Sequence, residues 1–180
     1  MSSWKRSLDN QTCKTVFLGD SITAQGKWEE RYGDDVCVLA IPGTTVYGCL
    51  KMSDFIPQLS PKKIFVMVGV NNLANWNYES AVKEDYQKLI DNLKGIGAQI
   101  YIESILPACS PSSVDNESIV EVNKIIKSVA ESNDCIYLDI HDEFLDENGN
   151  KMKRELTKDG IHLNENGFNV LYGIIDKYVK

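Results

Sequence analysis

The chain has 180 residues, of which 43% are hydrophobic and 25% are charged, and its formal net charge is −7. This length and composition fit one globular domain with a single core. The acidic balance disfavours nucleic acid and anionic membranes as partners, because a negatively charged surface repels phosphate groups. No apolar run approaches the roughly 20 residues of a membrane helix, and residues 1–10 lack the apolar stretch of a secretory signal. We therefore expect a cytoplasmic protein without membrane insertion, whose oligomeric state the sequence does not define.

The cysteines are odd in number and widely spaced, and they form no Cys-x-x-Cys pair. They are Cys13, Cys37, Cys49, Cys109 and Cys135. Cys37 and Cys135 lie inside apolar runs. This usage is typical of buried free thiols in a reducing compartment, and we expect no disulfide framework.

Short apolar runs alternate with longer amphipathic stretches along the chain. In chain order we expect a strand at 15–18, a weak helix at 21–32, a strand at 36–41, a weak helix at 44–55, a strand at 63–68, a helix at 79–93, a strand at 99–106, a helix at 116–132, a strand at 135–140 and a helix at 164–179. Near-continuous apolar runs favour strands that are covered on both faces. Residues 107–116, rich in Ser and Pro, are expected to form a surface loop.

This alternation predicts an α/β protein with a five-stranded parallel sheet between two helical layers. In open α/β sheets, ligands bind beyond the carboxyl ends of the strands. Residues that carry chemistry are therefore expected just after the strands.

Gly19-Asp20-Ser21 directly follows the first expected strand. A serine at a strand-to-helix turn can point its hydroxyl into the crevice, and its backbone N–H can face a developing negative charge. The tripeptide alone is equally typical of a helix N-cap in a turn.

Asp159 and His162 lie three residues apart just before the last expected helix. Histidine is the usual base that activates a serine, and a carboxylate on its other ring nitrogen orients it. The spacing predicts that one helical turn brings the two side chains to the same face. His141, which follows the fifth strand, is a competing base.

Two further segments offer hydrogen-bond donors at the ends of strands. Asn71, in Gly69-Val70-Asn71-Asn72, carries a neutral amide that can stabilise an oxyanion. Gly43, in Pro42-Gly43-Thr44, allows its backbone to approach a substrate closely. Each is also an ordinary turn residue.

Together these blocks resemble the SGNH hydrolases, also called GDSL-like lipases and acylhydrolases. The resemblance runs from Thr15 to about Val179 and keeps the family's order of motifs. The blocks are Gly19-Asp20-Ser21-Ile22, Gly43, Gly69-Val70-Asn71-Asn72 and Asp159-Gly160-Ile161-His162-Leu163.

The resemblance implies a flavodoxin-like, three-layer αβα fold in a single domain over residues 1–180. It implies ester hydrolysis through a covalent acyl-enzyme, without a metal or an organic cofactor and with a small-molecule acyl ester as partner. The nucleophile would be Ser21, the base His162 and the acid Asp159. The oxyanion donors would be the backbone N–H groups of Ser21 and Gly43 and the side chain of Asn71.

Two positions depart from the family pattern. Asn72 stands where the family usually has Asp, which affects the support around the nucleophile. The second block lacks the polar residue that often precedes its glycine, which leaves Gly48 as a competitor of Gly43. The Gly-x-Ser-x-Gly elbow of the classical α/β-hydrolases is absent.

Our leading hypothesis is a serine esterase that removes a short acyl group, such as acetyl, from a carbohydrate or small metabolite. The second hypothesis is a lysophospholipase or platelet-activating-factor-acetylhydrolase-like lipid esterase. The third is a flavodoxin-like binding module for phosphate or flavin, and the fourth is a related scaffold that has lost activity. Trp28, Trp76, Tyr78 and Pro107 are expected to line the pocket, to cap the core or to lie in loops.

Overall fold

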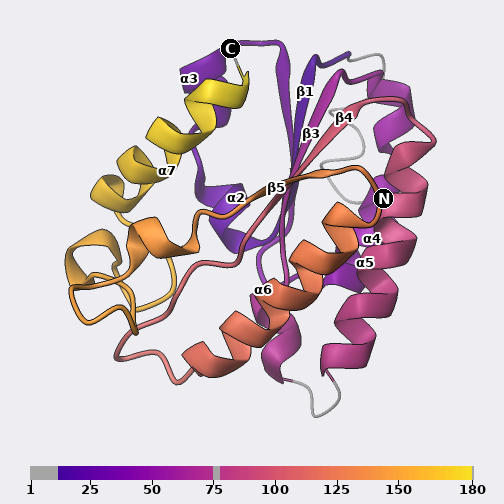
Figure 1. Ribbon diagram of the computed structural model, residues 1–180. Coiled ribbons are helices and arrows are strands. Elements are labelled where there is room, and N and C mark those ends of the chain that lie inside the picture. The colour runs from indigo at the N-terminus through magenta and orange to yellow at the C-terminus, as the bar shows by residue number, and fades with distance from the viewer. Residues whose placement is uncertain (1–11, 75–77, 180) are drawn as a thin grey trace.

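The computed structural model describes residues 12–74 and 78–179. Its centre is one sheet of five parallel strands in the order β2-β1-β3-β4-β5 (Figure 1). The strands are β1 (Thr15–Gly19), β2 (Val36–Ala40), β3 (Lys63–Met67), β4 (Gln99–Glu103) and β5 (Ile136–Leu138). The predicted parallel α/β fold is confirmed, and the strand order is that of flavodoxin-like sheets.

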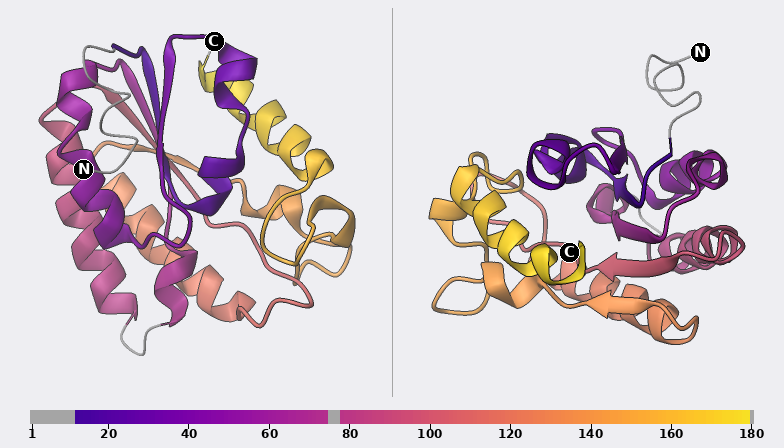
Figure 2. Two further views of the ribbon diagram at one scale, coloured as in Figure 1. Left: turned by 180° about the vertical axis from the view of Figure 1, so that it is seen from behind. Right: turned by 90° about the horizontal axis from the view of Figure 1, so that it is seen from above.

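Helices cover both faces of the sheet (Figures 1 and 2). One face carries α4 (Val46–Ser53), α5 (Tyr78–Lys94) and α6 (Asn116–Glu131). The other carries α2 (Ser21–Gln25), α3 (Trp28–Tyr32) and α7 (Glu165–Val179). Short 3₁₀ helices complete the chain: η1 (Ile56–Leu59), η2 (Val70–Ala74), η3 (His141–Phe144) and η4 (Arg154–Leu156).

The interior strand β1 shows why these sequences form a three-layer fold. Successive side chains of a strand point to opposite faces. Val16 and Leu18 enter the core under α4, α5 and α6, whereas Phe17 enters the core under α3 and α7. All three are at most 1% exposed. Full burial of such a side chain contributes about 1.5–3 kcal/mol, so both helical layers are held to the sheet by the same strand.

The long helix α5 confirms the predicted amphipathic pattern. Its core-facing residues are each 0% exposed: Val82, Tyr86, Leu89, Ile90 and Leu93. The helix ends at Lys94, and Gly97 follows with a φ of 79°. That left-handed backbone favours glycine, as expected for a helix stop.

Two strands end two or more residues earlier than predicted. β4 ends at Glu103 rather than at residue 106, and β5 ends at Leu138 rather than at residue 140. Beyond β4, the backbone N–H of Ile105 donates to the side-chain oxygen of Asn123 at 2.7 Å. A side chain from α6 thus replaces the neighbouring strand as hydrogen-bond partner, and the sheet opens there.

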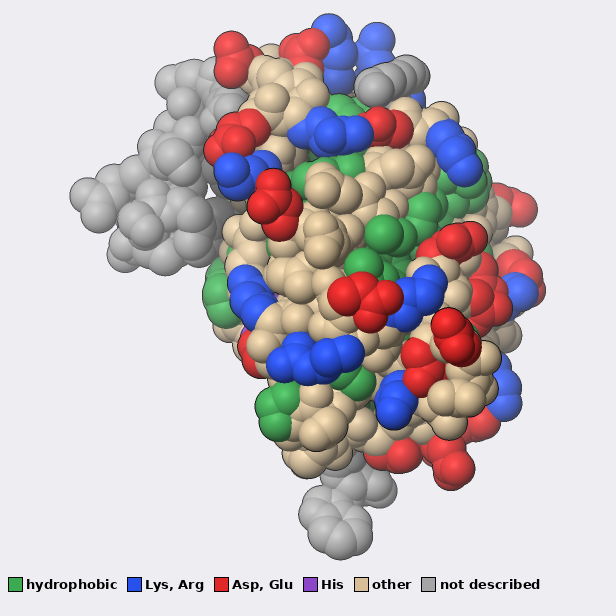
Figure 3. Space-filling model, turned by 90° about the vertical axis from the view of Figure 1, so that its left-hand side faces the viewer, with side chains coloured by type: hydrophobic (Ala, Val, Ile, Leu, Met, Phe, Trp, Pro, Cys, Tyr) green, Lys and Arg blue, Asp and Glu red, His purple; other side chains and the backbone are tan. Residues whose placement is uncertain are grey.

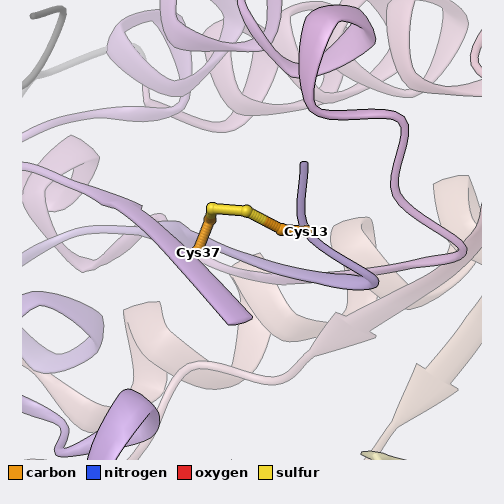
Figure 4. Close-up of a disulfide and its surroundings, with 2 residues drawn as sticks. All are labelled: Cys13 and Cys37. Carbon is orange, nitrogen blue, oxygen red and sulfur yellow. A yellow bond between two sulfur atoms is a disulfide. The ribbon is translucent and has the colours of Figure 1, made fainter. Parts of the chain in front are cut away.

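Cys13 and Cys37 form a disulfide (Figure 4), so the prediction of free thiols is wrong for this pair. Cys37 lies beside Val16 in the β1–β2 register, and Cys13 precedes β1 by two residues. Their Cα atoms are 5.8 Å apart, within the usual range for a disulfide. The bond depends on a strand register that spacing along the chain does not show. Cys49, Cys109 and Cys135 are free thiols, as predicted.

The face formed by α3 and α7 is held by aromatic stacking and an ion pair. Trp28 is 2% exposed and stacks on Phe17 with ring centroids 4.0 Å apart, so it belongs to the core. Arg31 of α3 donates two hydrogen bonds, of 2.9 and 2.6 Å, to Asp176 of α7. Figure 3 views this side of the molecule, where charged side chains of both signs surround a band of hydrophobic ones. Trp76 lies outside the described residues.

Across residues 12–74 and 78–179, none of the helices has the length and apolar character needed to cross a membrane.

Candidate active site

The connections that follow the strands gather at one end of the sheet, the lower end in Figure 1. The sheet order changes direction at β1, which pairs with β2 on one side and β3 on the other. Such a switch point leaves a crevice beyond the carboxyl ends of these strands. The predicted site residues after β1, β2 and β3 therefore belong to neighbouring segments.

Ser21 is the first residue of α2, directly after β1 and the N-cap residue Asp20. The carboxylate of Asp20 accepts a hydrogen bond from the backbone N–H of Ile22 at 3.0 Å, which fixes the start of the helix. A Cβ on Gly19 would lie 2.5 Å from the carbonyl oxygen of Met67, so only glycine fits before this turn. Ser21 itself is 8% exposed and lines a pocket.

Asp159 and His162 come together through a bend, and the expectation of a helical turn was wrong. One oxygen of Asp159, Oδ1, accepts hydrogen bonds from the backbone N–H groups of Ile161 and His162, at 3.1 and 2.8 Å. Its second oxygen, Oδ2, lies 2.7 Å from His162 Nδ1. Aspartate favours such local turns, because its side chain competes with the helical backbone for N–H donors.

The neighbouring loop holds this bend in place. Gly160 has a φ of 94°, and a Cβ at this position would lie 2.0 Å from the carbonyl oxygen of Cys109. The carbonyl of Gly160 accepts a hydrogen bond of 2.9 Å from the N–H of Cys109. The hydroxyl of Thr157 donates to the carbonyl of His162 at 2.7 Å. Only glycine at position 160 allows the two loops to approach this closely.

The second ring nitrogen of His162, Nε2, lies 2.9 Å from Ser21 Oγ, although 141 positions separate the two residues. Serine, imidazole and carboxylate thus form one hydrogen-bonded chain. Partial burial acts to raise the pKa of Asp159, but hydrogen bonds from the backbone and ring of His162 outweigh it and lower this pKa to about 2. The carboxylate is therefore ionised at neutral pH and favours a positive charge on the imidazole.

Asn71 and Gly43 lie on neighbouring turns. Asn71, in η2, lines the same pocket as Ser21, and its Nδ2 donates to the carbonyl of Thr44 at 2.8 Å. Gly43 precedes Thr44 in the exposed turn after β2, with a φ of 78°. Gly48 instead lies within α4, where a Cβ would lie 2.0 Å from the hydroxyl of Thr44. The turn glycine is thus Gly43, and the Asn71–Thr44 bond ties it to η2.

Asn72, which departs from the family pattern, has a structural partner. Its side chain is 4% exposed, and its Oδ1 accepts a hydrogen bond from the N–H of Val46 at 3.1 Å. Val46 begins α4, whose N-cap residue Thr45 makes no side-chain capping bond. Asparagine therefore caps α4 from η2, and an aspartate oxygen offers the same acceptor.

His141 lies away from this cluster, on the 3₁₀ helix after β5. It is 6% exposed, and its Nδ1 lies 2.9 Å from the carbonyl oxygen of Ile105. Asn123 lies 3.4 Å from the same nitrogen. The structure thus brings His162, and not His141, to Ser21.

Two buried carboxyl groups near the site were missed by sequence reasoning. Asp20 is 2% exposed, and burial raises its pKa to about 6 despite the hydrogen bond from Ile22 and the charge of His162. Glu103, at the end of β4, is also 2% exposed, and burial together with the charge of Asp20 raises its pKa to about 8. Its Oε2 has no hydrogen-bond partner. Glu103 is therefore protonated at neutral pH.

The pocket that contains Ser21 and His162 has a volume of about 390 Å³. Its remaining lining residues come from η2, from the start of α6 and from the bend before α7: Val70, Asn71, Leu73, Ser113, Val114, Asp115, Ser118 and Ile161. A larger cavity of about 530 Å³ lies beside residues 146–155, but it contains none of the predicted site residues. Chemistry rather than size therefore identifies the site. The segment after β4 was expected near the crevice, but no motif marked its individual residues.

Within the described part of the chain, no group of three or more His, Cys, Asp or Glu side chains is arranged to hold a metal ion.

The chain matches a known family of enzymes over most of its length. Residues 17–170 match the model of the GDSL-like lipase/acylhydrolase family. The chain belongs to this family, and it is a carboxylic ester hydrolase that acts on a small-molecule ester. A comparison with curated protein sequences found no match.

Solved structures share the fold at low sequence identity. A protein from Bacteroides fragilis, assigned as an acylhydrolase, is 21% identical, with a TM-score of 0.83 over 98% of this chain and 93% of its own. A protein from Streptococcus pneumonia, assigned as a platelet activating factor, is 22% identical, with a TM-score of 0.78 over 96% and 86%. An acetyl xylan esterase is also 22% identical, with a TM-score of 0.77 over 92% and 99%.

Proposed function

We propose that this enzyme is a single-domain serine esterase that removes a short acyl group, in the first place acetyl, from a carbohydrate or small metabolite. The observation that carries the proposal is the 2.9 Å contact between Ser21 Oγ and His162 Nε2, with Asp159 on the opposite ring nitrogen. This arrangement supplies a nucleophile, a base and an orienting acid, as acyl transfer requires.

In the proposed mechanism, Ser21 Oγ attacks the ester carbonyl while His162 Nε2 takes the hydroxyl proton. The tetrahedral intermediate collapses to an acyl-enzyme as the bond to the alcohol oxygen breaks, and His162 returns the proton to the leaving alcohol. Water then attacks the acyl-enzyme with the same base, releasing the acid and the free serine. Asp159 stabilises the imidazolium in both halves.

Three donors are proposed to stabilise the negative oxygen of the intermediate. They are the backbone N–H groups of Ser21 and Gly43 and the side chain of Asn71. An amide NH₂ carries two hydrogens. One hydrogen of Asn71 binds the carbonyl of Thr44, which holds the side chain in place, and the second can reach the oxyanion. One such donor is worth roughly 10²–10³ in rate.

The preference for a short acyl group rests on the size of the pocket, which has to hold the acyl group together with part of the alcohol. Its volume of about 390 Å³ is near the lower end of the range of about 300–1,000 Å³ for small-molecule sites. The acetyl xylan esterase of the same fold supports a carbohydrate ester. The protein assigned as a platelet activating factor is the reason to retain a lipid ester as the second candidate.

Labelling with a fluorophosphonate probe tests the nucleophile. We expect one adduct on Ser21, because an activated serine attacks phosphorus, and none on the matched Ser21→Ala variant. Peptide mapping locates the adduct. A folded protein that hydrolyses esters but carries no adduct at Ser21 would contradict the proposal.

A series of p-nitrophenyl esters tests acyl length. The proposal expects kcat/KM to be highest for acetate and to fall as the acyl chain lengthens. A rate that rises steadily to eight or more carbons would instead favour a lipid esterase.

A cytoplasmic location remains a prediction, and the Cys13–Cys37 disulfide weighs against it, because disulfides persist mainly in oxidising compartments. Alkylation of protein from its native cells under denaturing conditions, followed by intact-mass measurement, decides the question. Five alkylated cysteines would indicate a reducing compartment, whereas three would indicate an oxidising one.

A further inference from the structure

One wall of the Ser21 pocket has no part in the proposed chemistry. It is formed by the start of α6 and the residues before it, and it contributes Ser113, Val114, Asp115 and Ser118. Asp115 is the N-cap residue of α6. Among the described lining residues there is no lysine or arginine. This wall thus contains two serines and one aspartate, and no lysine or arginine lines the pocket beside them.

The carboxylate of Asp115 is held in a fixed orientation. Its Oδ2 accepts hydrogen bonds from the backbone N–H of Ser118 at 2.8 Å and from the hydroxyl of the same residue at 2.7 Å. A carboxylate has about four lone-pair sites, so two bonds on one oxygen leave acceptor capacity for a bound molecule. These bonds also lower the pKa of Asp115, so the group is ionised at neutral pH.

We propose that Asp115 is a specificity-determining residue whose carboxylate accepts hydrogen bonds from hydroxyl groups of the alcohol part of the ester. It selects acyl esters of neutral, polyhydroxylated alcohols over esters of anionic alcohols. This inference rests on the proposed esterase function of the same pocket.

The chemistry of the wall suits a sugar-like group. Hydrogen bonds from O–H donors to an ionised oxygen are roughly twice as strong as those between neutral groups. Ser113 and Ser118 line the same wall, and their hydroxyl oxygens can accept further hydrogen bonds. Apolar side chains on the remaining sides can contact the C–H groups of a ring: Val70, Leu73, Val114 and Ile161.

An anionic alcohol meets the opposite situation. It would enter a pocket that carries the negative charge of Asp115 and that no lysine or arginine lines. Charges that share a pocket of about 390 Å³ lie within the Debye length of about 10 Å at 0.1 M salt, so salt does not fully screen their repulsion. Asp115 is exposed, however, so water weakens both effects, and the expected changes are moderate.

The variant Asp115→Asn separates charge from structure. Asparagine is as good an N-cap as aspartate and has nearly the same shape, so α6 keeps its start. Glu117→Gln is the matched control, because it removes the same charge from the same exposed end of α6. Glu117 lines a different groove, beside residues 149–150, and not the Ser21 pocket.

Three acetyl esters are compared by kcat/KM: an acetylated methyl xyloside, an acetylated methyl glucuronide with a free carboxylate, and p-nitrophenyl acetate. Asp115→Asn is expected to lower the value for the neutral glycoside about 5- to 30-fold, which is the loss of a charge-assisted hydrogen bond at an exposed site. It is expected to raise the value for the uronic acid ester and to change that for p-nitrophenyl acetate less than twofold. Glu117→Gln is expected to leave all three unchanged.

The inference is overturned if Asp115→Asn changes all three values by the same factor, or if the ratio between the two sugars does not move. It is also overturned if Glu117→Gln changes that ratio as much. Failure of the esterase proposal has a separate signature, which is an absence of p-nitrophenyl acetate turnover that depends on Ser21. Turnover that requires Ser21 but ignores Asp115 would reject this inference alone.

Discussion

The two histidines occupy regions that look alike in the sequence and differ in their partners. His162 has a carboxylate oxygen 2.7 Å from one ring nitrogen and a serine hydroxyl 2.9 Å from the second. His141 has the backbone carbonyl of Ile105 at 2.9 Å from its Nδ1, and it is more deeply buried. Both follow a strand or bend at the same end of the sheet.

This difference shows what converts a histidine into a base. A carbonyl partner fixes a ring in place, but it carries no full charge with which to stabilise an imidazolium. An ionised carboxylate does both, and it leaves the second nitrogen for the nucleophile. The region of His162 is therefore suited to proton transfer, and the region of His141 to holding β4, β5 and α6 together.

The largest expected effect comes from replacing the nucleophile and each of the two histidines in turn. Ser21→Ala and His162→Ala are each expected to lower kcat by about 10⁴–10⁶-fold, by analogy with known triads. His141→Asn, which keeps a donor for the carbonyl of Ile105, is expected to change kcat less than tenfold. Turnover of p-nitrophenyl acetate measures both, with circular dichroism to verify folding. A loss below tenfold for His162→Ala, with a large loss for His141→Asn, would reverse the comparison.

The next effect concerns the acidic partner. Asp159→Asn can still accept the backbone N–H groups of Ile161 and His162, but it cannot stabilise the imidazolium, so kcat is expected to fall about 10²–10⁴-fold. Asp142→Asn, which removes the charge next to His141 in the chain, serves as the control and should leave kcat unchanged. Equal losses in the two variants would show a general effect of charge rather than an orienting role.

Each histidine region also contains an asparagine. Replacing the one near His162 is expected to lower activity, and replacing the one beside His141 is expected to lower stability. Asn71→Ala should keep the fold and lower kcat about 10²–10³-fold, through loss of an oxyanion donor. Asn123 is 8% exposed and bonds both the N–H and the carbonyl of Ile105. Asn123→Ala should lower the free energy of unfolding by about 1–3 kcal/mol with little change in kcat of the folded protein. Urea unfolding measures the change in stability, and steady-state kinetics measure the change in kcat. A loss of stability in Asn71→Ala but not in Asn123→Ala would contradict both predictions.

The smallest effect is a pH dependence of stability near Ser21. The pKa of Glu103 is raised from 4.5 in the unfolded chain to about 8 in the folded protein. Its contribution to stability is therefore fully present below pH 4.5 and is lost as the pH rises through about 8. Asp20, with its pKa raised to about 6, adds a change of the same sign. Thermal unfolding between pH 5 and pH 9 should show a falling Tm that is flatter in Glu103→Gln, and equal slopes would refute this account.

Much of the fold could be predicted from the sequence, because apolar periodicity reflects burial directly. The strand runs and the apolar face of α5 predicted their structures closely. The bend at Asp159 could not be predicted from spacing, since an aspartate three residues before a histidine suits a helical turn and a side-chain-capped bend equally well. The relative places of His141 and His162 depend on how the last connections return to the sheet.

Features that depend on contacts between distant segments could not be predicted from the sequence. The Cys13–Cys37 bond requires the β1–β2 register. The burial of Glu103 depends on the helical layers that cover the end of β4. Its position in an apolar run of the sequence does not establish this burial. The role of Asp115 in the pocket requires knowing that the start of α6 faces Ser21, which no motif encodes.

The distance along the chain between Ser21 and His162 has a consequence for protein synthesis. The proposed nucleophile is made 141 residues before its base, so a growing polypeptide on the ribosome holds an inert hydroxyl while those residues are added. Hydrolysis can begin only after the bend at Asp159 has docked against the segment that carries Ser21. Ester turnover therefore requires completed folding of the chain through that bend. Fragments that end before the bend should show no esterase activity.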